Sequence, residues 1–224
     1  MFMHRKHLLR PARLSILVFA AGTLFAALSL FAQKADINVN AFGAFPSTAN
    51  APPPGPFVNG IQYQPLTQTA DPSAGFRIGG RYIFSPIFGL EANFGYSRAT
   101  QHFTSVNPQQ SGVVYSHAKP FTIDYVATPR VNFHGFKPFI LGGAGVISYN
   151  ISSFAALPAR PEKIPVFEYG GGADYHPTAF PNLMSLRFQY RGLVGHAPDY
   201  LLPILATNNL INIAEPQVGL VFKF

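Results

Sequence analysis

The chain has 224 residues and no cysteine, which excludes a disulfide framework, thiolate metal sites and a lipid-modified N-terminal cysteine. Only 11% of its residues are charged and 14% are aromatic, a composition poor in helix formers and rich in strand formers. The formal charge of +7 does not indicate a nucleic-acid partner, because four of the 16 Lys and Arg residues precede Ala32 and all nine acids follow it, leaving twelve against nine, or +3.

The first predicted element is a secretory signal at residues 1–33. Its basic start is followed by an uncharged apolar run from Leu14 to Ala32, and a small residue stands at the expected cleavage site. Leu30 is larger than the residue usually found two positions before cleavage. A run of 19 residues is also long enough to remain as an uncleaved anchor. Removal is the favoured outcome, because nothing downstream resembles a soluble domain that needs a tether, and residues 34–224 are expected to form one domain.

The rest of the chain shows eight stretches of alternating polar and apolar residues, each bounded by turn signals. In the second stretch, Phe76 and Ile78 alternate with Arg77 and Arg81. The last stretch ends on the chain's final residue, Phe224. The predicted strands span residues 36–46, 73–84, 87–99, 117–133, 138–150, 163–175, 182–196 and 210–224.

The connections between these strands alternate in length. Short ones follow the second, fourth and sixth strands. Short turns at one rim and long loops at the other are typical of a transmembrane barrel of the bacterial outer membrane. Prolines in the first long connection argue against a strand there and favour a mobile loop. The long connections, which are the candidate surfaces for a ligand outside the cell, span residues 47–72, 100–116, 151–162 and 197–209.

The charged residues indicate which face of each strand is inside. Arginines and acids occur in equal numbers on the polar faces, which is the balance expected of a closed interior. Lysines occur only at strand ends or in turns, whereas a soluble sandwich would scatter them along its solvated faces. This pattern favours an all-β transmembrane barrel over a soluble secreted β-protein. The predicted interior network consists of Arg77, Arg81, Glu91, Asp124, Arg130, Glu168, Asp174, Arg187, Arg191 and Glu215.

The signal ending in Phe31, Ala32 and Gln33, the eight alternating strands and the terminal Phe224 resemble the OmpA-type, opacity-type family of eight-stranded outer-membrane β-barrels. The resemblance covers about residues 36–224 and implies an up-and-down antiparallel barrel in contact with outer-membrane lipid. It also implies that the barrel-assembly machinery recognises the C-terminal strand through Phe222 and Phe224. Larger members add a peptidoglycan-binding domain, and this chain is expected to stop at the barrel.

The interior charges are interpreted first as a packed plug that fixes strand register, because eight strands enclose a bore that side chains can fill. The alternative is a gate in a narrow pore for small solutes or ions.

A third reading is an enzyme that modifies lipid A, with His102, Ser105, His117, His196 and Asp199 near the outer rim. No nucleophile elbow, HExxH motif or metal-spaced cluster supports it, and the glycine runs at 142–145 and 170–172 lack the context of a phosphate loop. The sequence therefore predicts a non-enzymatic protein without cofactor, metal or catalytic residues, and with a structural or surface role such as membrane integrity, adhesion or recognition.

Overall fold

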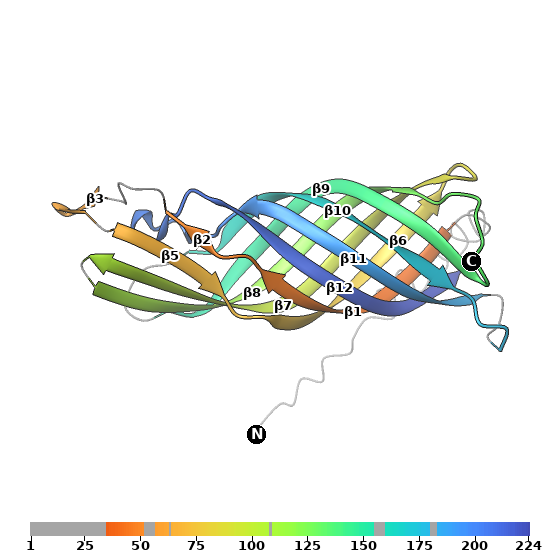
Figure 1. Cartoon of the computed structure of the whole chain (residues 1–224), viewed down its shortest axis with the longest axis horizontal. Coiled ribbons are helices and arrows are strands. Elements are labelled where there is room, and N and C mark those ends of the chain that lie inside the picture. Colours follow the sequence, from red (N-terminus) through yellow and green to blue (C-terminus); the bar gives the residue numbers. More distant parts are fainter. Residues whose placement is uncertain (1–34, 52–56, 63, 108, 155–159, 180–182) are drawn as a thin grey trace, which may run out of the picture.

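The computed structural model describes residues 35–224 except 52–56, 63, 108, 155–159 and 180–182. The predicted signal at residues 1–33 lies outside the described residues. The described chain is almost entirely strand, with one short 3-10 helix (Figure 1). No described helix has the length and apolarity needed to cross a membrane.

Eight strands form the wall of the barrel, and each overlaps a predicted strand in the same order, although β7 ends later and β8 begins and ends earlier than predicted. Each is amphipathic, so that one face can be buried while the other is exposed. They are β1 (Ala35–Pro46), β6 (Ser73–Ile83), β7 (Phe88–Asn107), β8 (Gln109–Ala127), β9 (Phe136–Phe154), β10 (Glu162–Tyr175), β11 (Met184–His196) and β12 (Leu210–Lys223).

The wall closes on itself. Neighbours along the chain pair in antiparallel fashion from β6 through β12, and β1 lies between β6 and β12. The first and last strands are held in a register that pairs Ile37 with Phe222 and Val39 with Leu220. Closure leaves no edge strand around the ring, which satisfies the backbone groups that a lipid environment cannot. The predicted eight-stranded antiparallel barrel is thus confirmed.

The connections differ from the predicted ones at the end of the barrel opposite the C-terminus. Residues 100–116 are not a loop, because β7 and β8 continue as a paired hairpin as far as Val106 and Gln109. The Pro-rich stretch 47–72 was expected to lack strands, yet its described parts contain β2 (Ala49–Asn50), β3 (Phe57–Val58), β4 (Ile61–Gln62) and β5 (Gln64–Ala70). Strand β5 pairs with β7 and β2 pairs with β5, so a sheet extends beyond the barrel wall.

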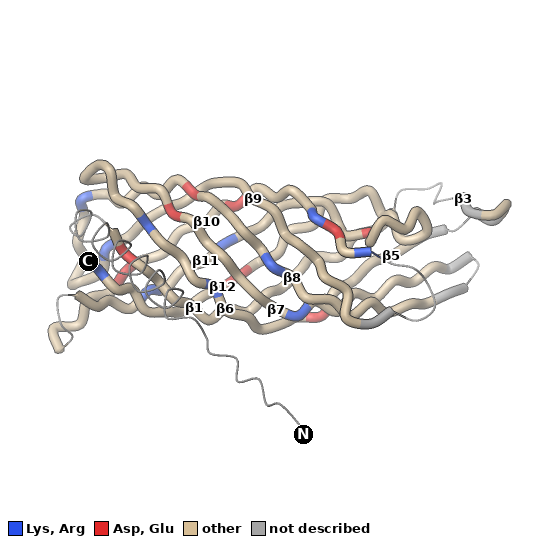
Figure 2. The backbone as a smooth tube through the Cα atoms, turned by 180° about the vertical axis from the view of Figure 1, so that it is seen from behind, with Lys and Arg blue, Asp and Glu red and all other residues tan. Residues whose placement is uncertain are grey.

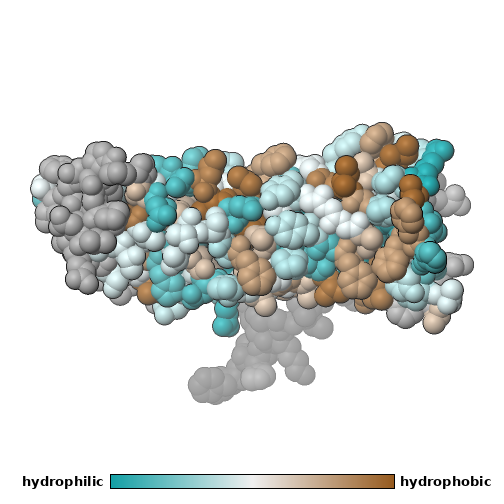
Figure 3. Space-filling view, viewed as in Figure 1, coloured by the Kyte–Doolittle hydropathy of each residue, from teal (hydrophilic) through white to brown (hydrophobic). Residues whose placement is uncertain are grey.

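The faces of the wall have opposite character. Large apolar side chains point outward from every strand of the ring, among them Ile78, Phe94 and Ile123, and Figure 3 shows hydrophobic groups gathered on the half nearer the C-terminus. Charged and amide side chains point inward and are buried. This arrangement is inside-out relative to a soluble barrel and suits a wall that faces acyl chains.

Candidate functional site: the buried charge network

Four arginines project into the bore from two strands. Arg77 and Arg81 lie on β6, and Arg187 and Arg191 lie on β11, each pair spaced so that both side chains fall on the inward face. Three of the four are completely buried. Five acids from β7, β8, β10 and β12 meet them: Glu91, Asp124, Glu168, Asp174 and Glu215.

These nine side chains form one connected network. Arg191 is its centre and contacts Glu91, Asp124 at 2.8 Å and Glu168 at 2.6 Å. Arg77 continues the network from Glu168, at 2.9 Å, to Glu215.

The other two arginines extend the network toward the end with the C-terminus. Arg187 binds Asp174 through two nitrogens, at 2.7 and 2.9 Å, and also contacts Glu91 at 3.2 Å. Arg81 contacts Glu91 at 2.7 Å. Each charge therefore has an opposite charge within bonding distance, which offsets the cost of removing it from water.

The network also contacts the ring of Phe139, which the sequence analysis did not identify as an interior residue. The guanidinium groups of Arg81 and Arg187 lie 4.8 and 4.9 Å from the centre of the Phe139 ring. Phe139 is on β9, whose sequence is apolar on both faces, so alternation alone did not show which of its residues point inward. Cation–π contact adds to the ion pairs in this dry environment.

Glycines make room for the network where the wall approaches it. A Cβ atom on Gly143 would lie 2.4 Å from Asp124 Oδ1, and one on Gly219 would lie 2.3 Å from Asn40 Oδ1. Real Cβ atoms do not approach so closely, so these positions accept only glycine without a shift of the neighbours.

Arg130 is the one predicted network residue that the structure places elsewhere. Strand β8 ends at Ala127, and Arg130 follows in an exposed turn. Pro129 cannot donate a backbone hydrogen bond to a strand ladder, which accounts for the early end of the strand. The equal numbers of arginines and acids expected inside are therefore wrong: the interior network has four arginines against five acids.

Asp36 is a further buried acid that the sequence analysis missed. It is 4% exposed and lies on β1, on the inward face shared with Asn38 and Asn40. The alternation of these three residues with Ile37 and Val39 is a signal that identifies it. The charges of Arg81 and Arg187 act on its carboxylate.

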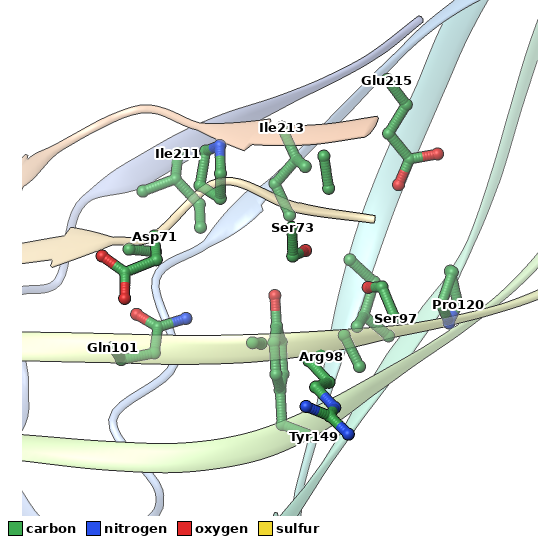
Figure 4. A pocket seen from close by; sticks show the side chains of 16 residues that line it. Asp71, Ser73, Ser97, Arg98, Gln101, Pro120, Tyr149, Ile211, Ile213 and Glu215 are labelled. Atoms are coloured by element: carbon green, nitrogen blue, oxygen red, sulfur yellow. The ribbon is translucent and has the colours of Figure 1, made fainter. Parts of the chain in front are cut away.

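Above the network, toward the end with the long hairpin, the bore is filled by apolar side chains. Phe42, Phe103, Tyr149, Ile164 and Leu193 belong to one buried cluster. Between this cluster and the network lies a cavity of only about 30 Å³, bounded by Tyr149, Ser97 and Glu215 among others (Figure 4). A space of this size holds about one water molecule.

Residues 197–209, here called the cap segment, fold back over this cluster. The Tyr200 ring is fully buried, its hydroxyl lies 3.1 Å from Ser116 Oγ, and its ring packs edge-on against Phe103. Gln68 of β5 donates to the carbonyl of Pro198 at 3.0 Å. The predicted fourth long loop is thus an ordered closure of the bore.

Backbone geometry and a carboxylate hold the turn of the cap segment. Tyr200 and Leu201 have φ values of 56° and 59°, which L-residues adopt only when the surroundings enforce them. The backbone N–H groups of Asp199 and Tyr200 both donate to Glu162 Oε2, at 3.0 and 2.7 Å. Burial raises the pKa of the Tyr200 phenol above its usual range.

The histidines proposed for lipid chemistry are not assembled into a catalytic group. His102 pairs with exposed Asp71 at 3.0 Å, and Ser105 is three positions away on the same strand, which places it on the opposite face. His117 contacts the Tyr96 hydroxyl at 2.9 Å, and His196 is exposed at the end of β11. Among the described residues, no three His, Asp or Glu side chains form a group suited to a metal ion.

The two C-terminal aromatics lie at the end of the closing strand. Phe222 is paired with Ile37 on β1 and with Met184 on β11. The Phe224 N–H donates to the Ala35 carbonyl at 3.1 Å, and its side chain is exposed. Their recognition by an assembly factor stays a prediction.

Comparison with known proteins gives one family and a set of folds. The model of the outer membrane protein beta-barrel domain matches residues 18–224. The solved structure of the outer membrane protein OprG from Pseudomonas aeruginosa aligns with a TM-score of 0.62 at 13% identity, over 85% of this chain and 96% of that one. Neisserial surface protein A aligns at 0.51 and 12% identity, over 85% and 97%. No curated protein matches the sequence significantly.

Proposed function

We propose that this chain, which belongs to the outer membrane protein beta-barrel domain family, acts as a sealed barrel for adhesion or recognition. It holds at the cell surface an extension, which consists of β5 and the part of the β7–β8 hairpin that continues beyond the ring. The protein is an eight-stranded barrel of the bacterial outer membrane. Barrels of this kind place their short turns in the periplasm and their long connections outside the cell. The hairpin of β7 and β8 and the cap segment are accordingly on the extracellular side.

The main support for this proposal is that side chains fill the bore. The buried charge network occupies it at one level, and the apolar cluster under the cap segment occupies it at a second level. A path for solutes requires a continuous channel lined by water-accessible groups. A barrel whose bore is filled by two packed layers is better suited to displaying a binding surface than to conducting ions or solutes.

The extension offers a largely polar surface on which Asp71 is a charged side chain and Tyr115 is an exposed aromatic residue. Tyr115 is 51% exposed on the outer face of the hairpin, and Thr104 and Ser111, which pair with each other, are exposed four positions further along the same face. Tyrosine combines a large apolar ring with a hydroxyl group and is enriched at binding interfaces, so this face is suited to a saccharide or protein partner. Its inner face is occupied by the cap segment, so the outer face is the surface available to a partner.

The test compares cells that display the whole protein with cells that display a shortened hairpin. Replacing residues 102–113 by Asn-Gly joins Gln101 to Val114, which face each other in the register of β7 and β8. We expect both proteins to show heat-dependent gel mobility, and only the whole protein to retain cells on an array of immobilised glycans and matrix proteins. Equal retention on every surface would contradict the proposal.

Two alternatives predict different results in simple assays. A narrow pore predicts discrete conductance steps of the purified protein in planar bilayers. An enzyme of the outer leaflet predicts a change in lipid A mass on expression that disappears in His102→Ala or His196→Ala. We expect neither steps nor a mass change, because the bore is filled and these histidines lie apart from Ser105.

A further inference from the structure

The periplasmic mouth of the barrel encloses a cavity that has no part in the surface role. Its volume is about 470 Å³, and its walls come from the turns that follow β6 and β8 and from the ends of β9 and β12. A second hollow of about 340 Å³ adjoins it and shares Asn132, Lys137 and Lys223. Figure 2 shows several Lys and Arg positions at this end, where the C-terminus lies.

The charges of the cavity are unevenly compensated. On its floor, Arg81 and Asp174 belong to the buried network, and Asp36 lies in the field of Arg81 and Arg187. At its rim stand Arg130, Lys137 and Lys223, and no ion pair joins any of them to a carboxylate in the described part of the chain. Lys223 Nζ donates only to the neutral Ser185 hydroxyl, at 2.9 Å. The rim therefore carries three positive charges without a direct ion pair, although the nearby carboxylates of Asp36 and Asp174 attract Lys223 and so offset part of this charge.

Two of these cations are aimed into the mouth and not at the surrounding headgroups. Lys137 shares a face of β9 with buried Phe139, and Lys223 shares a face of β12 with buried Val221, so both follow the inward face. Lysines that merely reach for water or headgroups around a barrel would lie on the outward face. The like charges of Lys137 and Lys223 repel each other, and Asp174 and Asp36 offset only part of this repulsion, so an anion between the two lysines would relieve it further.

The opposite wall of the cavity is apolar. Ile83, Ile87 and Val131 line it, and Phe88 borders it from the outward face that it shares with Phe94; all four remain 37–42% exposed. An occupant that matches both walls has an anionic group for the rim and a hydrocarbon part for this side. Phospholipids of the periplasmic leaflet have this construction, and they reach the mouth from the adjoining membrane.

We propose that the periplasmic mouth binds the phosphate group of an anionic phospholipid through Arg130, Lys137 and Lys223, with the lipid's glycerol and upper acyl carbons against Ile87, Phe88 and Val131. The recognised chemistry is a phosphate ester, and soluble phosphate esters share it. The apolar wall is the reason for assigning the site to the lipid.

The experiment measures retention of lipid by the purified protein in a non-ionic detergent. Native mass spectrometry with phosphatidylglycerol is expected to show one retained lipid, and phosphatidylcholine is expected to be lost under the same conditions. Lys137→Gln with Lys223→Gln should lower retention of phosphatidylglycerol about tenfold or more, since each lysine near an anionic lipid is worth about 1 kcal/mol. Arg130→Gln, in an exposed turn, should lower it without any effect on folding.

The matched control is Lys119→Gln with Lys163→Gln, which removes the same charge from strands β8 and β10 away from this cavity. Heat-dependent gel mobility verifies that each variant is folded. Equal loss of phosphatidylglycerol from the control and the test variant would overturn the site. Displacement of the lipid by soluble glycerol phosphate at equal concentration would overturn the lipid as its occupant.

Discussion

Arg191 shows how much of the barrel's stability can depend on one side chain. It is fully buried and is the only described arginine that contacts Glu91, Asp124 and Glu168 together. Substitution by methionine fills a similar volume but leaves three buried carboxylates short of a partner. We expect Arg191→Met to cost about 3–5 kcal/mol, because breaking a buried pair leaves a desolvated charge uncompensated. The measurement is the temperature at which the folded band loses its electrophoretic shift.

Arg130 supplies the control for that measurement. It has the same chemistry and was predicted from the sequence to lie in the same network, but it stands in an exposed turn. Arg130→Met should leave the transition temperature unchanged. A similar decrease in both variants would mean that loss of positive charge, and not loss of buried pairing, sets the stability.

Tyr200 gives the cap segment a dependence on pH. Burial raises the pKa of its phenol, so the folded state favours the protonated form. The stabilisation it provides is complete below the unfolded pKa of about 10 and is lost as the pH rises through the raised folded value. In a tyrosinate absorbance titration, the difference between the wild type and Tyr200→Phe should appear well above pH 10. A difference with an ordinary midpoint would show that the ring is accessible.

Among the elements, the outer part of the β7–β8 hairpin is the one that the sequence pattern did not predict. Residues 100–116 are rich in Ser, Thr and Gln on both faces, which is also the composition of a loop. Outside the membrane a strand needs no lipid-facing band, so the strong alternation that marks residues 87–99 weakens just where the hairpin continues. Gln101, Phe103 and Ser105 still occupy the inward face at every second position. They are buried by the cap segment, which lies about 100 residues further along the chain.

The charge network was largely predictable for a different reason. A charged side chain in the middle of a strand that contacts lipid must point into the bore, because burial in lipid is too costly. Alternation alone therefore predicts the inward position of the four network arginines, Arg77, Arg81, Arg187 and Arg191. Arg130 fits the same alternation, and only the local effect of Pro129 removes it from the strand. Which acid pairs with which arginine depends on the stagger of all eight strands, and that is not encoded in any one of them.

The cap segment should open without loss of the barrel. Phe103 is 3% exposed and packs against Tyr200, so Phe103→Ala leaves a cavity in a region outside the membrane. We expect chymotrypsin added to whole cells to cleave within the cap segment of this variant while heat-dependent gel mobility is retained. Tyr115→Ala, which removes an outward-facing ring from the same hairpin, should remain resistant. Cleavage of both variants to the same extent would mean that the cap segment is not held by this contact.

For the molecule as a whole, two different seals lie in series along one bore. The buried charge network closes it by ion pairing, and the apolar cluster with the cap segment closes it by dry packing. Resistances in series add, so either seal alone is enough to prevent ion flow. A wall of eight strands leaves a bore that side chains just fill, which is why each layer can be complete.

This arrangement predicts that removing one seal does not produce a pore, whereas removing both does. The variant Glu91→Ser with Arg191→Ser opens the network while keeping its net charge, and replacing residues 198–207 by a short Gly-Ser linker removes the cap segment. In planar bilayers we expect no conductance steps from the wild type or from either variant alone, and steps from the combined variant, because only there is the bore continuous with water at both levels. Steps from the cap-segment variant alone would show that the network does not seal, and a silent combined variant with intact heat-dependent mobility would show that the apolar cluster closes the bore without the cap segment.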